Sequence, residues 1–535
     1  MRLVTESIVN EKELWEEKGF IMPGYDTVKL HENTKAAPAW IHFGCGNIFR
    51  GYIACLADEL IKSGEMEGGI IAADSFDTET IEKIYVPFDD LVLLVGLRAQ
   101  GDKYLRVIGS IGGAVCAKGD GVAKLKEYAV KDSLQMISFT ITEKGYAVRD
   151  MNGGVFPFVA EDIAKGPEGE LNSAMSIITA MLLERYKANA APIAMVSMDN
   201  CSQNGSKLRE SVMFIAEKWH ENGFVDDGFM AYIGDESKVS FPWSMIDKIT
   251  PRPDMSVCEE LTNMGIEDMQ PVKTNRGTFI APFVNAEMPQ YLVIEDNFPN
   301  GRPPLEKAGV YMTDRETVDR AEKMKVMTCL NPLHTALAVF GCLLGKTKIS
   351  EEMNDADLKE LVYRLGYKEG LPVVIDPGII RPEDFLDEVL TQRLPNPYLP
   401  DTPQRIATDT SQKLAIRFGE TIKAYEKKGG TDSLVLIPMV IAAWIRYLTG
   451  FNDEGAPMEL SDDPMMDELK AIVKSEWFKN KEPMDKSAVE KLLKNEKLFG
   501  TDLVKAGLAD KITADLEAML SGEGMVRKIL HEKLA

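Results

Sequence analysis

The sequence predicts an α/β fold in two parts, a doubly wound parallel-sheet domain over residues 1–311 followed by an all-α domain over residues 312–535. Three observations predict it. Short apolar segments alternate with helical segments up to about residue 311, which is typical of a parallel sheet. Strand-like runs then nearly vanish, with Val373–Ile375 as the expected exception. A chain of 535 residues is also too long for a single hydrophobic core.

Composition and charge exclude several classes of protein. The net charge of −23 repels phosphate backbones and anionic membranes, so an anionic substrate would need a local cationic pocket. The seven cysteines are scattered and never in CxxC spacing, which indicates reduced thiols in a cytoplasm and no zinc or disulfide framework. The N-terminus lacks an apolar signal core, and the apolar run Leu434–Leu448 is too short to span a membrane. We therefore expect a cytoplasmic protein that binds neither nucleic acid nor membrane.

The first strand carries the clearest motif. Residues 1–36 are expected to form an extension with one or two short surface helices, and strand Ala39–Phe43 then runs into GCGNIFRG and a helix over Tyr52–Lys62. Glycines in such a turn let backbone N–H groups approach a pyrophosphate at the helix N-terminus. The third glycine of GxGxxG is missing, so a mere tight turn is the alternative. The arrangement predicts a Rossmann-type domain whose cofactor-binding residues are Gly44, Gly46, Asn47, Ile48, Phe49 and Arg50.

The second strand, Gly69–Ala73, ends in Asp74. An acidic residue at this distance from the glycines can hold a ribose 2′-hydroxyl and repel a 2′-phosphate. The cofactor is therefore expected to be NAD rather than NADP, with Asp77 as the alternative residue for this role.

Polar clusters follow two of the later strands. Five more strands are expected, at residues 91–97, 104–108, 136–141, 193–197 and 291–296. The clusters TITEKGY and MDNCSQNG stand at the carboxyl ends of the third and fourth of these, where ligands bind in parallel sheets. The alternative is that Thr, Asp and Asn there only cap helices.

Lys325, Asn331 and His334 form the most suggestive stretch of the helical part. Asn331 and His334 are three residues apart, so on a helix they share one face. A buried Lys suits proton transfer because burial can move its pKa toward neutrality, and Asn and His can hydrogen-bond a substrate oxygen. The alternative is a capped helix with a solvated Lys and a hydrogen-bonded core His. Other helices are expected beyond this stretch, including one over residues 403–428.

These motifs together resemble one known family. The chain resembles the long-chain mannitol dehydrogenases, a family of polyol and sugar-acid oxidoreductases, from about residue 39 to the C-terminus. The segments that carry the resemblance are GCGNIFRG, ITEKGY, SMDNCSQNG, SMIDKITPRPD, YLVIEDNFPNGRPPLEKAGV, EKMKVMTCLNPLHTALA, RLPNPYLPDTPQRIATDTSQKLAIR and AAWIRYLTGFNDEG. The resemblance implies a helical C-terminal domain after the Rossmann-type domain, an active site between them, and no metal.

The resemblance also assigns roles to particular residues. It implies that Lys325 is the catalytic base and acid, and that Asn331 and His334 match the family's Asn and His. Asn200 resembles the family's second oxyanion-holding Asn, with Asn204 a less favoured alternative, and Glu322 resembles a Glu on the proton path.

One departure concerns the catalytic lysine. Five residues separate Lys325 from Asn331, where the family usually has four, so an inserted residue would remodel the helix entry and leave Lys323 as a fallback.

The expected function is NAD-dependent hydride transfer on a secondary alcohol. Lys413 and Arg417 stand four apart and would share one helix face, and Arg393 stands just upstream. These cations suit a substrate carboxylate, and the alternative is an ordinary solvated face. The resemblance then favours interconversion of D-mannonate and D-fructuronate over tagaturonate reductase or mannitol 2-dehydrogenase activity. The intact Lys, Asn and His argue against the alternative of a non-catalytic NAD-binding regulator. We expect a monomer or a small homo-oligomer.

Overall fold

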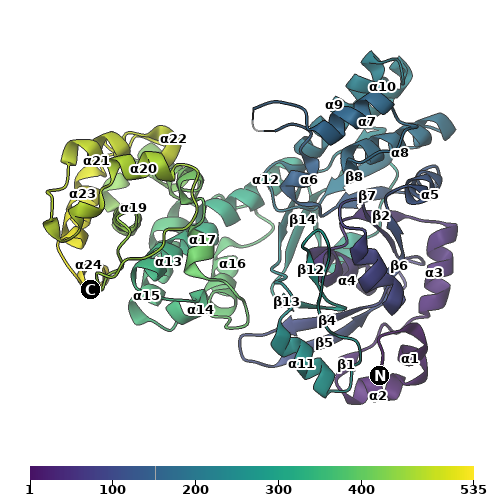
Figure 1. The fold of residues 1–535 in the computed structure, drawn as a ribbon, viewed down its shortest axis with the longest axis horizontal. Coiled ribbons are helices and arrows are strands. Elements are labelled where there is room, and N and C mark those ends of the chain that lie inside the picture. Colours follow the sequence, from purple (N-terminus) through teal and green to yellow (C-terminus); the bar gives the residue numbers. More distant parts are fainter. Residues whose placement is uncertain (151) are drawn as a thin grey trace. The chain divides into compact units, whose positions relative to one another are not determined.

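The computed structural model describes residues 1–150 and 152–535 (Figure 1). The chain forms two compact units, Met1–Asp319 and Arg320–Ala535, each described by itself below. The domain boundary expected after residue 311 lies shortly before this division and stays a prediction.

A six-stranded sheet forms the centre of the first unit, and every neighbouring pair in it is parallel. In spatial order its strands are β6 (Ile111–Cys116), β3 (Ile70–Asp74), β2 (Trp40–Phe43), β7 (Met136–Phe139), β8 (Ile193–Ser197) and β9 (Val239–Ser240). The chain enters at β2, winds outward through β3 to β6, and then returns to β7 on the other side. This order confirms the predicted doubly wound sheet and places the switch point beside β2.

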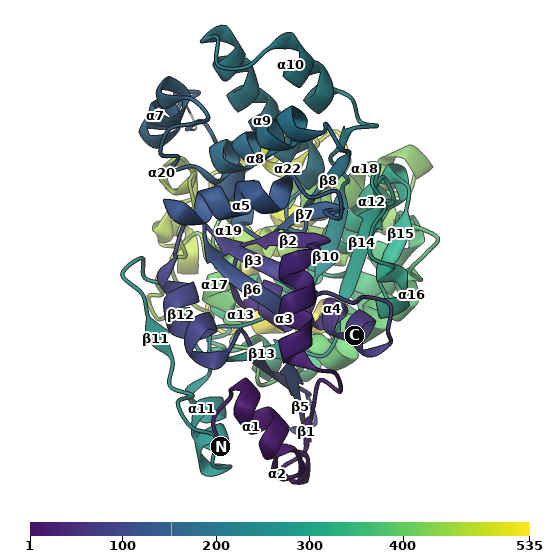
Figure 2. The same cartoon turned by 90° about the vertical axis from the view of Figure 1, so that its right-hand side faces the viewer.

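Side chains from the two faces of β2 enter two different cores. Ile41 and Phe43 pack with helices α5 (Asp120–Ala129), α8 (Ala174–Ala188) and α9 (Asn204–Glu221), while Trp40 packs with α4 (Ala54–Lys62) on the other face. This alternation follows from the two-residue period of a strand. Helices therefore cover both faces, as Figures 1 and 2 show.

Smaller sheets complete the first unit. Two of the expected strands are confirmed as β4 (Val92–Leu97) and β5 (Lys103–Ile108). They pair antiparallel and lie between β1 (Phe20–Ile21) and β13 (Phe283–Glu287). A third sheet contains β10 (Ser244–Asp247), β14 (Tyr291–Glu295) and β15 (Tyr311–Thr313), and β11 (Val272–Lys273) pairs with β12 (Phe279–Ile280).

The N-terminal extension is more than a surface addition. It holds helices α1 (Thr5–Asn10), α2 (Lys12–Glu17) and α3 (Thr27–Ala36), and Trp15 of α2 is fully buried.

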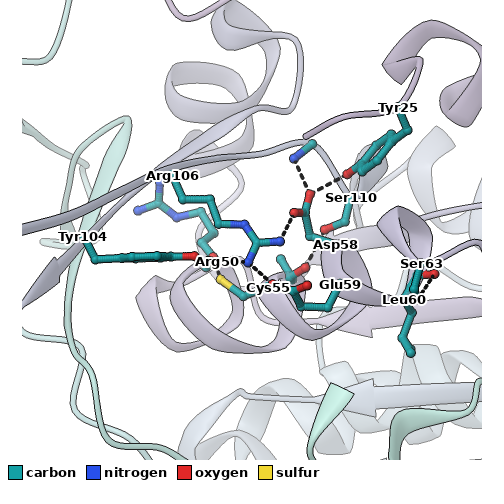
Figure 3. A network of polar contacts seen from close by, with 12 residues as sticks. Tyr25, Arg50, Cys55, Asp58, Glu59, Leu60, Ser63, Tyr104, Arg106 and Ser110 are labelled. Atoms are coloured by element: carbon teal, nitrogen blue, oxygen red, sulfur yellow. Dashed lines mark hydrogen bonds and ion pairs between the residues drawn. The ribbon is translucent and has the colours of Figure 1, made fainter. Parts of the chain in front are cut away.

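A buried polar network ties this extension to α4 and β5 (Figure 3). Asp58 of α4 accepts hydrogen bonds from the Tyr25 hydroxyl at 2.5 Å and the Gly109 N–H at 3.0 Å, and it forms an ion pair with Arg106 of β5.

The second unit is helical, as predicted. Its longer helices are α13 (Asn331–Leu343), α15 (Ala356–Arg364), α18 (Glu420–Lys428), α19 (Leu436–Tyr447), α21 (Lys486–Leu493), α23 (Ala509–Leu520) and α24 (Met525–Leu534). Helix α12 (Arg315–Met324) leads into it, and α19 is buried along its whole length, as its apolar sequence predicts.

Two local predictions in this unit are wrong. Val373–Ile375 is not a strand, because Leu371–Val373 forms a 3₁₀ turn in which Pro372 has no N–H for a strand ladder. The helix expected over 403–428 is also broken. Helix α17 (Pro403–Ala407) ends before Asp409, whose φ of 54° lies in the left-handed region. A 3₁₀ turn over Thr410–Gln412 and a π-helical turn over Ala415–Gly419 then lead into α18.

One helical run, Arg315–Leu343, is apolar and long enough to cross a membrane by length and composition. Most of it is buried within the structure, as in the core helix of a soluble protein, so it is weak evidence for a membrane span.

Candidate functional site

The glycine turn after β2 has the form that dinucleotide binding requires. Gly44 has φ +108°, and a Cβ there would lie 2.2 Å from the Thr140 carbonyl oxygen, so only glycine fits. A Cβ on Gly46 would have nothing within 4 Å, which leaves open space beside its backbone. A Cβ on Gly51 would lie 2.7 Å from Cγ1 of Val284 in β13. Gly51 thus allows the close packing of helix on strand that the third glycine usually allows.

Hydrogen bonds of Arg50 and Asn47 tie this turn to segments that lie far along the chain. Arg50 is fully buried and donates to the Ala281 carbonyl at 2.7 Å and to Asn47 Oδ1 at 2.8 Å. The Asn47 amide donates in turn to the Pro251 carbonyl at 3.1 Å. Burial lowers the pKa of Arg50, and no carboxylate lies in ion-pair range of it among the residues that the structure describes. A buried cation without a counter-ion, next to an open glycine turn, fits a diphosphate group.

The side chain of Phe49 does not face the turn. It is fully buried and stacks on His42 with ring centroids 4.3 Å apart. Of Phe49, only the backbone can therefore contribute to the predicted cofactor site.

Asp74 lies against the glycine turn. Its Oδ2 accepts from the Cys45 N–H at 3.2 Å, and its Oδ1 accepts from the N–H groups of Phe76 and Asp77 at 2.8 Å. Asp77 is buried and accepts from the Thr274 hydroxyl at 2.6 Å, away from the turn. This geometry favours Asp74 over Asp77 as the ribose-binding residue.

The ends of β7 and β8 are linked through Asp199. Its carboxylate accepts from the N–H groups of Ile141 and Thr142 at 2.9 Å and from the Tyr146 hydroxyl at 2.5 Å. Burial raises the pKa of Asp199, although these hydrogen bonds oppose the rise. Asp199 and Tyr146, which belong to the two polar clusters, therefore have a structural role.

Asn204 and Asn200 have different environments. Asn204 is fully buried, and its amide donates to the carbonyls of Ser197, Asp199 and Ser244 while its oxygen accepts from the Ser244 N–H. Asn200 is exposed. A saturated, buried amide cannot bind a substrate, so Asn200 is the better candidate for the oxyanion role.

A π-helical turn over Lys325–Cys329 accounts for the unusual spacing in the second unit. The Leu330 N–H donates to the Lys325 carbonyl, five residues back, at 3.1 Å. A π turn accommodates one residue more than an α turn, which matches the extra residue between Lys325 and Asn331. Lys325 is buried, and Asn331 begins α13 directly after the turn.

The same rare geometry recurs at other predicted site residues. The described chain has six π-helical turns, and four of them carry Arg50, Lys325, Arg393 and Arg417. π-Helical turns are frequent at functional sites, so their presence at these four residues supports the predicted functional roles of the four cations.

Cations gather around His334 within the second unit. Its Nε2 lies 3.7 Å from Oδ2 of Asp401, and the positive charges of Arg417, Arg393 and Arg405 act on it. Burial lowers the pKa of His334 to about 4, with these arginines adding to the effect and Asp401 opposing it. His334 is therefore neutral near pH 7 and can exchange hydrogen bonds with a hydroxyl.

Arg417 faces the start of α13. Its guanidinium donates to the Thr335 hydroxyl, which donates in turn to the Asn331 carbonyl at 3.1 Å. Burial lowers the pKa of Arg417 to about 10, and no carboxylate pairs with it in the part of the chain that the structure describes. Arg393, which is buried, lies near enough to influence the same histidine.

Lys413 makes contacts that the sequence did not predict. It stands directly before the turn that carries Arg417, whose N–H donates to the Lys413 carbonyl at 2.9 Å, while the Lys413 ammonium donates to the carbonyls of Ile406 and Thr408 at the end of α17. Burial and the Arg417 charge lower the pKa of Lys413 to about 8. Lys413 is therefore a capping residue next to the site.

Sequence reasoning missed Asp401 and Arg405, which form an ion pair beside His334. Their i, i+4 spacing was the available signal.

No group of three potential metal ligands occurs within residues 1–150 and 152–535. The expectation that no metal takes part stays a prediction.

Comparison with known proteins agrees with this site. Residues 38–307 match the mannitol dehydrogenase Rossmann domain, and residues 317–520 match the mannitol dehydrogenase C-terminal domain. A D-mannonate oxidoreductase of Thermotoga maritima is 49% identical over 540 residues, covering 99% of each chain.

Solved structures share the fold. Mannitol 2-dehydrogenase of Pseudomonas fluorescens, in a ternary complex with NAD and D-mannitol, is 24% identical, with a TM-score of 0.71 over 100% of this chain and 99% of its own. A substrate-free D-sorbitol dehydrogenase is 23% identical, with a TM-score of 0.78 over 94% of this chain and 97% of its own. On these matches and this site, the chain belongs to the mannitol dehydrogenase family of oxidoreductases.

Proposed function

We propose that this protein is an NAD(H)-dependent D-mannonate oxidoreductase that interconverts D-mannonate and D-fructuronate. One observation carries the choice of a sugar acid. The Arg417 guanidinium is partly buried and has no carboxylate partner among the described residues, and it lies next to the stretch that carries Lys325, Asn331 and His334. Removing a cation from water, even in part, is costly unless an anion joins it, and the carboxylate of a hexonate would be that anion. The T. maritima relative supports the same substrate.

The cofactor assignment rests on Asp74. Its carboxylate lies beside the glycine turn, where it would accept hydrogen bonds from a ribose and repel a 2′-phosphate. Gly44, Gly46 and the backbone of residues 47–50 would hold the diphosphate, with the Arg50 charge behind them.

Each site residue then has a distinct role. When bound, NADH supplies a hydride to the carbonyl carbon of the substrate. Lys325 as the ammonium gives a proton to the carbonyl oxygen in this direction, and as the neutral amine takes the hydroxyl proton in the reverse direction. The amides of Asn331 and Asn200 donate to the developing oxyanion.

The remaining residues orient the substrate. Neutral His334 hydrogen-bonds a substrate hydroxyl, and Arg417 with Arg393 holds the carboxylate. Lys413 keeps the segment before Arg417 in place through its carbonyl contacts. Glu322 is partly buried one turn before Lys325 and is our candidate for passing the proton to solvent.

Compartment and assembly belong to the same proposal. We place the enzyme in the cytoplasm because its seven cysteines are free thiols. A monomer or a small homo-oligomer remains our expectation for its assembly.

A substrate panel tests the proposal. We would follow NADH and NADPH absorbance at 340 nm with D-fructuronate, D-tagaturonate and D-fructose at equal concentrations. We expect the highest kcat/KM with NADH and D-fructuronate. Faster turnover of D-tagaturonate would identify a tagaturonate reductase, and faster turnover of D-fructose would identify a mannitol 2-dehydrogenase. No turnover of any of them, with NADH bound, would favour a regulator.

A further inference from the structure

The turn of the β11–β12 hairpin lies on the segment that follows β3 (Figure 2). The Thr274 hydroxyl donates to Oδ2 of Asp77 at 2.6 Å, and the Asn275 N–H donates to Oε1 of Glu79 at 3.2 Å. The guanidinium of Arg276, at the tip of the turn, lies 5.4 Å from the ring centroid of Phe76. Three successive hairpin residues therefore each contact a residue between positions 76 and 79.

The side chain of Phe76 is 65% exposed, the largest exposed fraction among the exposed aromatic side chains of the described residues. A ligand that covered this ring would gain free energy from the apolar area buried. Arg276 is also exposed and lies near one part of the ring.

Phe76 is also held at a fixed place relative to the predicted ribose site. Its N–H donates to Oδ1 of Asp74 at 2.8 Å, while the other oxygen of that carboxylate accepts from the glycine turn. A base joined to a ribose on Asp74 would therefore lie within reach of the Phe76 ring. The backbone of Asp74 is also held by the residue that follows β6, because the Ala117 N–H donates to the Asp74 carbonyl at 2.8 Å.

We propose that Phe76 and Arg276 form a stacking platform for the adenine ring of the dinucleotide, and that the β11–β12 hairpin holds this platform in place. The inference rests on the proposed NAD(H) binding. A purine stacks well on an aromatic ring and on the plane of a guanidinium, and both are present here. The contacts of Asp77 and Glu79 with the hairpin turn fix Arg276 opposite Phe76. Asp77 thus acts in the cofactor site by supporting the platform and not by binding the ribose.

Equilibrium binding to the full-length enzyme tests the platform. Calorimetry would measure Kd for NADH, for AMP and for reduced nicotinamide mononucleotide, which lacks the adenine. Phe76→Ala should weaken NADH and AMP by about 5- to 150-fold, the range that loss of base stacking gives, and leave the mononucleotide unchanged. Phe76→Trp should retain wild-type Kd values for NADH and AMP.

Phe158 supplies a matched control. It is 44% exposed on α7 (Pro157–Lys165) in the same unit but stacks on Phe156, away from this hairpin, so Phe158→Ala should change none of the three Kd values. Wild-type binding of NADH and AMP by Phe76→Ala would overturn the platform and leave the proposed function standing. A wild-type enzyme that binds neither NADH nor AMP would overturn the cofactor assignment together with the platform.

Discussion

Arg417→Ala is the substitution whose effect can be worked out most fully from the structure. Burial lowers the pKa of Arg417 from its ordinary value to about 10. That difference corresponds to about 3 kcal/mol of cost for the charged form in the free enzyme. A substrate carboxylate that pairs with the guanidinium would offset a cost of this size. We therefore expect Arg417→Ala to raise KM for D-fructuronate about 100-fold, since breaking a buried charge pair typically costs about 2–5 kcal/mol.

The assay compares substrates that differ in charge. Steady-state reduction with NADH would give KM for D-fructuronate and for neutral D-fructose with each enzyme. The KM for D-fructose should change by less than about threefold, because a neutral ketose offers no charge to lose. Thermal melting of the apoenzyme should change little, because the variant removes a partly buried cation and a single hydrogen bond to Thr335.

Lys413→Ala is the matched comparison. Lys413 donates to backbone carbonyls at the end of α17, so its loss should lower the melting temperature more than it raises KM. If Arg417→Ala raised KM equally for D-fructuronate and D-fructose, the carboxylate role of Arg417 would be refuted. A large fall in the melting temperature of this variant would refute it too.

Three further perturbations have defined outcomes. Asp74→Ala should weaken NADH binding about tenfold and reduce the preference for NADH over NADPH, whereas an unchanged preference would contradict the ribose role. Asn200→Ala should lower kcat about 100-fold and cost less stability than Asn204→Ala, which should cost about 3 kcal/mol; the reverse pattern would exchange the roles of the two residues. Burial raises the pKa of Asp355, but Arg527 outweighs it and lowers the pKa to about 2, so this carboxylate stabilises the fold above pH 4 and loses that effect as the pH falls toward 2. Urea unfolding at pH 7 and pH 3 would measure the loss of unfolding free energy on acidification. This loss should be about 1–2 kcal/mol smaller in Asp355→Asn than in the wild-type protein, and an equal loss in both would count against the ion pair.

Local patterns made the nucleotide-binding part predictable. The glycine turn and Asp74 depend on a few consecutive residues and on strands of clear apolar character, and the structure has them in the expected elements. Gly51 could not be assigned from its spacing, because its close packing partner, Val284, lies far along the chain.

The cationic cluster could be predicted only in part. Arg417, Arg393 and Lys413 were predicted from their residue type and spacing. The contacts of the Lys413 ammonium with the carbonyls at the end of α17 depend on the left-handed backbone at Asp409, which breaks a helix that the apolar pattern alone does not interrupt. Asp401 joins His334 only through the packing of α13 with the segment before α17. The platform residue Arg276 likewise reaches Phe76 through a short hairpin whose strands have two residues each, too short for a periodic pattern.

The most direct test of the central claim is a single-turnover measurement of hydride transfer with Lys325→Ala. Enzyme saturated with NADH would be mixed with excess D-fructuronate and followed at 340 nm, with NADH affinity determined separately by fluorescence. Wild-type enzyme should consume the bound NADH, while Lys325→Ala should bind NADH normally and transfer hydride about 100- to 10,000-fold more slowly. Lys323→Ala, two residues away on the same helical run, should transfer hydride at the wild-type rate. Hydride transfer by Lys325→Ala at the wild-type rate, or its loss in Lys323→Ala instead, would contradict the account.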